Sequence, residues 1–160
     1  MPLRPPPSEN LDPRAPTVWR IANLLSALPF LAVAVAVAFG LRRLDVAWWL
    51  AILPLAVVLL ISGVLALVLP GVTWRRWRYE VGEDEVDLQH GLLTVTRTLI
   101  PMARIQHVDT RRGPLERRFG LASVVLYTAA GASEIPALAL PVADAVRDRI
   151  AAIANTLEDL

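Results

Sequence analysis

The sequence contains no cysteine, which excludes several kinds of chemistry at once. A disulfide framework, a thiolate nucleophile and a thiolate metal ligand are all ruled out. Lysine is absent as well, so all 16 basic residues are arginine, which we interpret as a genomic bias in composition. With 15 acidic residues the formal net charge is +1, and this gives no global argument for nucleic acid as a partner.

The familiar sequence signatures of enzymes are also missing. There is no His-Glu-x-x-His pair, no Gly-x-Ser-x-Gly elbow and no glycine loop that could cradle phosphate. The only histidines, His90 and His107, fall on different expected elements and have no obvious further ligands for a metal. We therefore expect a protein that is not an enzyme and has no cofactor and no metal.

Two uncharged apolar runs, Ile21 to Leu41 and Val46 to Leu69, dominate the first half of the chain. Each has about 20 residues or slightly more, enough for a helix rising about 1.5 Å per residue to cross a hydrocarbon layer of about 30 Å. Only residues 42–45 separate them, so the helices must run antiparallel. The sequence predicts a transmembrane hairpin over residues 18–72, with helices at about 18–41 and 46–69. No acidic residue within the spans suggests a proton path.

The charges and aromatic residues around the runs predict how the hairpin lies in the membrane. The turn carries Arg42 and Arg43, whereas more cations flank the outer ends, namely Arg4, Arg14, Arg20, Arg75, Arg76 and Arg78. This excess predicts a multi-pass protein of the cell membrane with both termini cytoplasmic. Aromatic and basic side chains are expected at the membrane interface, namely Trp48, Trp49, Trp74, Arg75, Arg76, Trp77 and Arg78.

A competing interpretation makes the first run a secretory signal. Ala36-Val37-Ala38 resembles a small-residue cleavage site after an apolar stretch. The run is long for such a segment, however, and a second span follows at once, so we favour the hairpin. The residues before it, 1–17, are rich in proline and are expected to form a disordered tail.

The residues after the hairpin, 73–160, suffice for one small domain made of strands and a final helix. Apolar alternation predicts strands at 77–81, 86–88, 93–99 and 105–110, the last with a bulge, followed by a central strand at 121–128. In the third strand an apolar face is expected from Leu93, Val95 and Leu99. A short strand near Glu134 is limited by Pro136. A helix from about Pro141 carries an apolar stripe, namely Val142, Val146, Ile150, Ile153 and Leu157.

The segment 104–122 reads Arg-Ile-Gln-His-Val-Asp-Thr-Arg-Arg-Gly-Pro-Leu-Glu-Arg-Arg-Phe-Gly-Leu-Ala. It resembles the signature of the bacterial membrane-associated pleckstrin-homology (PH) domain family, the YdbS-like or DUF304 group. The resemblance implies two transmembrane helices and then this domain. With the order of elements, it predicts a two-helix transmembrane hairpin followed by a mainly antiparallel β PH-like barrel capped by a C-terminal α-helix. The resemblance implies no settled biochemical activity.

Part of this motif has a purely structural explanation. Gly113-Pro114 is expected to leave a strand and start a short helix that ends at Gly120. Leu115 and Phe119 would face the barrel, with Arg112 and Glu116 outside. The functional interpretation is a basic patch for an acidic partner or anionic lipid headgroups, made of Arg111, Arg112, Arg117 and Arg118. The acidic turn at residues 82–85 argues against phosphoinositide capture at the first hairpin.

Two functional hypotheses follow from these patterns. The favoured one is a membrane-anchored, non-catalytic interaction or scaffold module at the cytoplasmic face of the bilayer. Its partner would be another membrane PH-domain protein or a second copy of the chain, with no nucleic acid involved. The alternative is an envelope protein whose transmembrane hairpin senses or modulates the bilayer or packs against a transporter.

Overall fold

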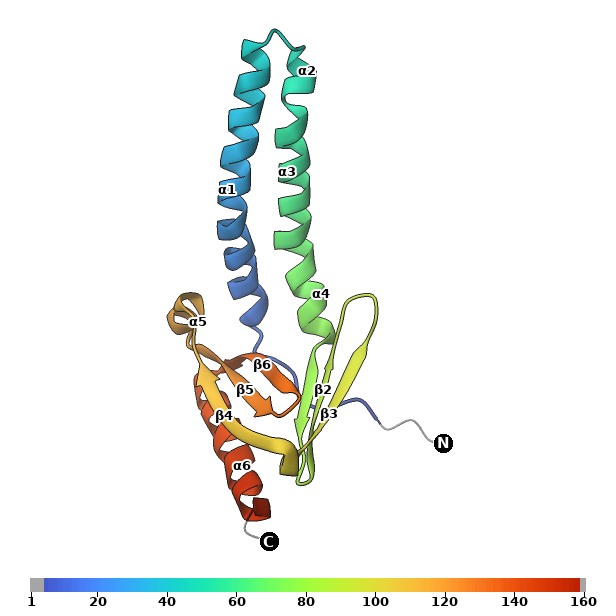
Figure 1. The fold of residues 1–160 in the computed structure, drawn as a ribbon, viewed down its shortest axis with the longest axis vertical. Coiled ribbons are helices and arrows are strands. Elements are labelled where there is room, and N and C mark those ends of the chain that lie inside the picture. Colours follow the sequence, from blue (N-terminus) through green and yellow to red (C-terminus); the bar gives the residue numbers. More distant parts are fainter. Residues whose placement is uncertain (1–4, 159–160) are drawn as a thin grey trace. The chain divides into compact units, whose positions relative to one another are not determined.

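The computed structural model describes residues 5–158, which divide into two compact units (Figure 1). One, called here the apolar unit, is Pro16–Gly71. The other, called the sheet unit, combines residues 5–15 with residues 72–158. The chain therefore leaves the sheet unit near residue 15 and returns to it near residue 72.

The apolar unit is the expected hairpin with longer helices than predicted. Helix α1 covers Ala15–Arg43 and passes through Pro29 without a break. After a turn, the second span runs from Trp48 to Arg76 as α2 (Trp48–Ala51), α3 (Leu53–Gly63), the π-helical segment η1 (Val64–Val68) and α4 (Leu69–Arg76). Both spans are long and apolar enough to cross a membrane. Many of their large side chains are exposed, as expected for surfaces that face lipid.

The π-helical segment leaves one backbone carbonyl in need of a partner. The Leu69 N–H donates to the Val64 carbonyl, five residues back, so it is not directed to Leu65. The residue after Leu69 is Pro70, which has no N–H to offer. The Asn23 side chain, on α1, fills this gap because its Nδ2 donates to the Leu65 carbonyl at 2.9 Å. An unsatisfied carbonyl in lipid costs several kcal/mol. This hydrogen bond between the two spans therefore stabilises the hairpin.

The sheet unit contains two separate three-stranded antiparallel sheets. The first has the order β1-β2-β3, from β1 (Arg78–Val81), β2 (Glu85–His90) and β3 (Thr96–Pro101). The second has the order β4-β5-β6, from β4 (Ile105–Arg111), β5 (Leu121–Thr128) and β6 (Gly131–Ala139). Between them lies the short helix η2 (Met102–Arg104). Within residues 5–158 no strand pairing joins the two sheets, so the elements are PH-like without the closed barrel that the sequence predicted.

Helix α6 (Leu140–Glu158) ends the unit and packs on β4 and β5. The expected stripe is confirmed at Val146 and Ile150, which are buried, but wrong at Val142, which is 42% exposed. Ala143 takes that place in the core. The side chain of Leu157 lies outside the described residues. Most of β5 is buried from Leu121 to Leu126, and its bounds confirm the predicted central strand.

The third and sixth strands differ from the sequence prediction. β3 starts only at Thr96, and Leu93 is fully exposed, so the expected apolar face is wrong. Ile100, on the opposite side of the strand, is buried instead. β6 continues through Pro136 to Ala139, because it is an edge strand and its pairing with β5 shifts register there. The predicted bulge in β4 is confirmed by a register shift between Ile105 and His107.

Residues 5–14 are folded against the two sheets, in contrast to the disordered tail that we expected over residues 1–17, of which residues 1–4 lie outside the described residues. Glu9 and Tyr79 exchange two backbone hydrogen bonds of 3.0 Å, which extends the edge of β1. The Asp12 N–H donates to the Ala137 carbonyl in β6 at 3.3 Å. Leu11 is only 2% exposed. This segment, residues 5–14, is called the strap below because it bonds to both sheets.

We predict that Asn23→Leu lowers the free energy of unfolding of the hairpin by about 1 kcal/mol, because the Leu65 carbonyl loses its donor in an apolar medium. The measurement is unfolding of the full chain in mixed micelles, followed by helix circular dichroism. Ser26→Ala is the matched control, since the Ser26 hydroxyl bonds only to a carbonyl of its own helix, that of Asn23. A leucine variant as stable as the unchanged protein would contradict the account.

Candidate functional site

The short helix α5 (Pro114–Phe119) forms one corner of the sheet unit and organises the basic patch. Pro114 occupies the start of the helix, where its missing N–H leaves no bond unmade. The helix stops at Gly120, whose φ of 67° lies in the left-handed region that glycine tolerates. The predicted strand-to-helix turn is therefore confirmed, and Leu115 and Phe119 are half-buried.

Glu116 faces inward, which corrects the expectation that it lies outside. Its carboxylate accepts the Gly113 N–H at 2.7 Å and the Ser123 hydroxyl at 2.8 Å. The Ser123 hydroxyl in turn accepts the Ala137 N–H at 3.2 Å. Ser123 is buried, and Ala137 has a φ of 50°, so these bonds satisfy a buried hydroxyl and hold a strained backbone. Glu116 thus connects the start of α5 to β5 and, through Ser123, to β6.

The four arginines of the patch gather around α5 in two different states. Arg111 donates to the Tyr127 hydroxyl and its guanidinium lies 5.6 Å from the centre of that ring. Arg112 donates from Nε to the Leu121 carbonyl at 3.3 Å. Arg117 and Arg118 are exposed, and within residues 5–158 neither makes an ion pair or a side-chain hydrogen bond. The corner therefore offers two fixed and two unengaged guanidinium groups.

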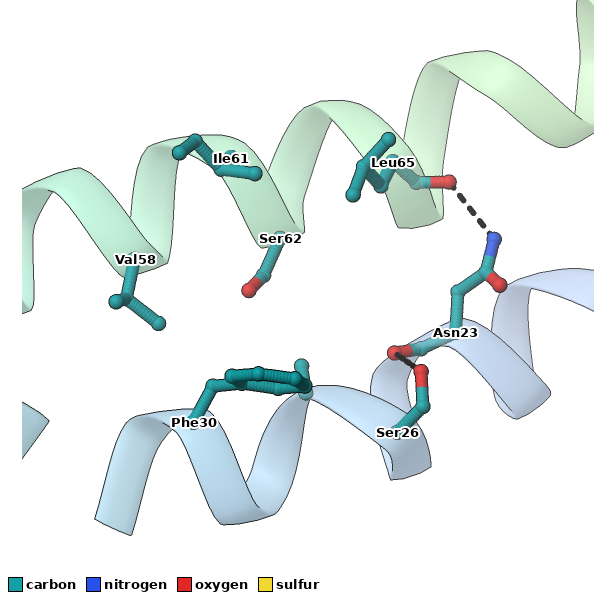
Figure 2. Close-up of a pocket in the computed structure, with 8 residues that line it drawn as sticks. Asn23, Ser26, Phe30, Val58, Ile61, Ser62 and Leu65 are labelled. Atoms are coloured by element: carbon teal, nitrogen blue, oxygen red, sulfur yellow. Dashed lines mark hydrogen bonds between the residues drawn. The ribbon is translucent and has the colours of Figure 1, made fainter. Parts of the chain in front are cut away.

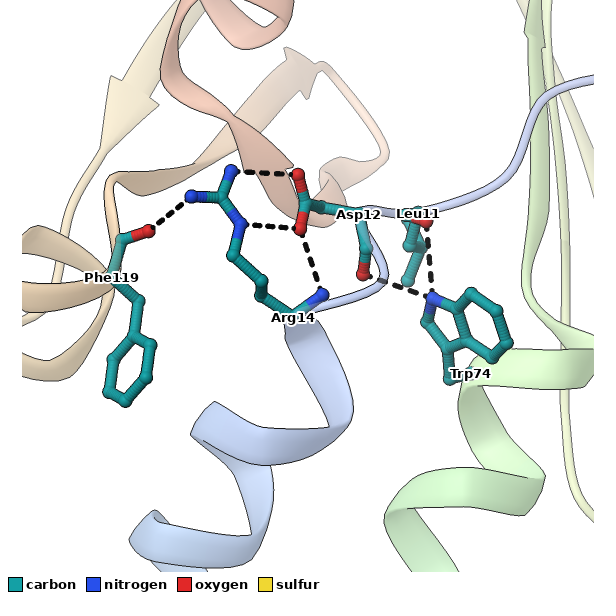
Figure 3. A network of polar contacts seen from close by, with 5 residues as sticks. All are labelled: Leu11, Asp12, Arg14, Trp74 and Phe119. Atoms are coloured by element: carbon teal, nitrogen blue, oxygen red, sulfur yellow. Dashed lines mark hydrogen bonds and ion pairs between the residues drawn. The ribbon is translucent and has the colours of Figure 1, made fainter.

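A fifth arginine reaches this corner from the strap (Figure 3). Arg14 donates from one terminal nitrogen to the Phe119 carbonyl at 2.9 Å, at the end of α5. Its Nε and other terminal nitrogen each donate to the Asp12 carboxylate at 2.9 Å. The same carboxylate accepts the Arg14 N–H at 2.8 Å. Sequence reasoning missed this contact because it assigned Arg14 to the tail, although Asp12-Pro13 is a typical turn signal.

Electrostatics around Asp12 are dominated by Arg14. Hydrogen bonds from the Arg14 guanidinium lower the pKa of Asp12, against the opposing effect of partial burial. The same pair raises the pKa of Arg14. Asp12 is 11% exposed, so its charge is held in a partly desolvated position with its partner in place. The strap is therefore fastened to the α5 corner by a charge-assisted bond.

Comparison with known proteins shows the family of the chain. The model of the bacterial PH domain family matches residues 21–154, which cover most of the hairpin and most of the sheet unit. The chain belongs to the bacterial PH domain family.

Two proteins of Bacillus subtilis (strain 168) resemble the chain. The UPF0699 transmembrane protein YdbS is 38% identical over 157 residues, which are 98% of this chain and 99% of that protein. The UPF0699 transmembrane protein YdbT is 32% identical over 67 residues, which are 42% of this chain and 14% of that protein. No solved structure matches the chain.

The residues expected at the membrane interface of this PH-domain protein have different surroundings. Trp48 and Trp49 are exposed on α2 of the apolar unit, and Arg75 is exposed on α4. Trp77 is only 8% exposed and stacks on His90 with the ring centres 5.5 Å apart, so it belongs to the interior of the sheet unit instead. Trp74 donates from its indole nitrogen to the Leu11 and Asp12 carbonyls at 3.1 and 3.0 Å (Figure 3).

The other two arginines expected at the interface, Arg76 at the end of α4 and Arg78 at the start of β1, bond to backbone. Arg76 donates to the Leu92 carbonyl, and Arg78 donates to the carbonyls of Arg75 and Trp77. The second histidine, His107, is exposed and stacks on Tyr127 at 4.1 Å. Within residues 5–158 no group of three His, Cys, Asp or Glu residues is arranged to hold a metal ion.

We predict that Asp12→Asn lowers stability at neutral pH and flattens its dependence on acid. Because the pKa of Asp12 is lowered by folding, its contribution is present above its unfolded value of about 3.9 and is lost as the pH falls through the folded value. The thermal midpoint of the detergent-solubilised full chain, measured between neutral pH and about pH 3, checks this.

The matched control for this prediction is Asp84→Asn, since Asp84 is exposed on the turn between β1 and β2. It should leave the midpoint at neutral pH unchanged. If Asp12→Asn gave the same stability as the unchanged protein at neutral pH, the strap contact would carry no stability and the account would be wrong.

Proposed function

We propose that this PH-domain protein is a non-catalytic docking module, held in the cell membrane by its hairpin with both termini cytoplasmic. The observation that carries the proposal is the α5 corner, where Arg117 and Arg118 are exposed while Glu116 is turned inward. Glu116 therefore does not face the four positive charges, which point outward from this corner. The excess of arginine on the outer flanks of the hairpin supports the orientation.

The geometry of the corner suits an acidic protein surface. Tyr127 and the Leu121 carbonyl hold Arg111 and Arg112 in place, which reduces the entropy lost when a partner binds. The guanidinium groups of Arg117 and Arg118 can each form two parallel hydrogen bonds with a carboxylate. A partner anchored in the same membrane gains from a high effective concentration, so modest contacts suffice.

The proposed partner is a second membrane PH-domain protein or another copy of this chain. Support comes from Bacillus subtilis, which carries two UPF0699 transmembrane proteins that both resemble this sequence. We propose that the domain provides a positively charged docking surface at the membrane and no catalytic activity.

A second candidate function places the partner against the hairpin. A cavity of about 290 Å³ lies between the two spans of the apolar unit and is lined by polar and apolar residues (Figure 2). Its polar residues are Asn23, Ser26 and Ser62. Polar groups inside a span mark helix contacts or functional sites, which favours packing against a transporter or another membrane helix.

We predict that a photo-crosslinking residue in place of Asp109, exposed on β4 close to the patch, captures the partner in native membranes. Arg117→Gln with Arg118→Gln should lower the yield of the adduct several-fold because the carboxylates of the partner lose their donors. The control, Arg104→Gln with Arg149→Gln, removes the same charge from exposed positions elsewhere on the sheet unit and should leave the yield unchanged.

The mass of the adduct separates a second copy from a second PH-domain protein. A photo-crosslinker at Ser62 provides the comparison for the hairpin hypothesis. An adduct formed from Ser62 and insensitive to the patch variant, with none from position 109, would favour the second candidate. A protein that remains strictly monomeric and uncrosslinked from both positions would contradict both.

A further inference from the structure

The loop between β2 and β3, residues 91–95, is the most exposed apolar segment of the sheet unit that neither the fold nor the basic patch explains. Leu93 is 100% exposed and Val95 is 55% exposed. The loop turns tightly at Gly91, which has a φ of 128°, and only glycine fits there because a Cβ would lie 1.9 Å from the Thr94 carbonyl oxygen. Leu93 and Val95 thus form an apolar tip that is available for contact with another apolar environment.

The loop is attached to the end of the second apolar span. Arg76, the last residue of α4, donates to the Leu92 carbonyl, and both residues belong to the sheet unit. Next to them Trp77 stacks on His90, the last residue of β2. From Leu69, where the apolar run ends, to Arg76 a helix rises about 10 Å, slightly more than the headgroup region of about 5–8 Å on each side of the hydrocarbon.

Charge on the first sheet is divided between its two ends. The end that carries the loop also carries Arg75 and Arg76, and residues 91–96 contain no acidic residue. The opposite end is the turn between β1 and β2, where Glu83 and Asp84 are exposed (Figure 1). β2 separates the two ends by about 17 Å at roughly 3.3 Å per residue. An apolar tip with a basic surround fits an anionic lipid surface, and the acidic end fits water.

We propose that residues 91–95 insert into the headgroup layer, so that Leu93 and Val95 contact lipid and Arg76 holds the loop beside the exit of the second span. The loop is then a third attachment of the protein to the membrane, in addition to its two helices. This inference goes beyond the docking role of the α5 corner and does not depend on it. The proposed partner of the loop is the lipid surface. Arg75 and Arg76 beside the loop make anionic lipid the preferred kind.

The absence of cysteine makes a direct test simple, because a single introduced cysteine is labelled alone. Leu93→Cys and the control Glu83→Cys, both exposed positions, carry an environment-sensitive fluorophore on the full chain. The protein is reconstituted in vesicles of phosphatidylethanolamine and phosphatidylglycerol. Quenching by iodide reports water, and quenching by a spin label on the lipid near the headgroup reports the interface.

At position 93 iodide quenching should be several-fold weaker than at position 83, and the spin-labelled lipid should quench position 93 only. Adding Val95→Glu to the Leu93→Cys protein should restore iodide quenching, since a carboxylate resists insertion next to anionic lipid. Equal iodide access at both positions would overturn the proposal. Protection at position 93 without quenching by the spin-labelled lipid would overturn it too, because a protein partner would then cover the loop.

Discussion

The indole N–H of Trp74, shared between the Leu11 and Asp12 carbonyls, is the contact on which the arrangement of the sheet unit depends. Residues 11 and 12 lie shortly before the first span, which begins at Ala15, and Trp74 lies in the last turn of the second, which ends at Arg76. The bond therefore joins the point where the chain leaves the sheet unit to the point where it returns. From there the strap continues to Tyr79 in one sheet and to Ala137 in the other, which ties together two sheets that share no strand pairing within residues 5–158.

Two arginines next to this junction hold two further features of the sheet unit, the α5 corner and the loop at residues 91–95. Arg14 extends from the strap to the end of α5, where the exposed Arg117 and Arg118 lie, and Arg76 extends from α4 to the loop at Leu92. Residues next to the membrane spans thus hold both the basic corner and the apolar loop, whereas the acidic turn at residues 83–84 lies at the far end of β2.

The sequence predicts best where one strong pattern decides the outcome. The uncharged runs predict the hairpin, and the apolar stretch at 121–128 predicts β5, because burial on every side requires such composition. Prediction fails where a tertiary partner overrides the local pattern. Glu116 turns inward to serve Ser123, Trp77 stacks on His90, and the proline-rich strap orders because Trp74 and Tyr79 supply its hydrogen bonds. These contacts arise only when the chain is folded, so a local sequence pattern does not indicate them.

The most direct test of the junction is a distance between the strap and α4 in a lipid bilayer. Spin labels at Asn10→Cys and Arg75→Cys, both exposed and in a chain without other cysteines, suit double electron–electron resonance on the full chain in lipid nanodiscs. The account predicts one narrow distance distribution, which broadens when Trp74→Phe removes the indole donor. A broad distribution in the protein that retains Trp74 would contradict it, because the strap would then be detached from the exit of the second span.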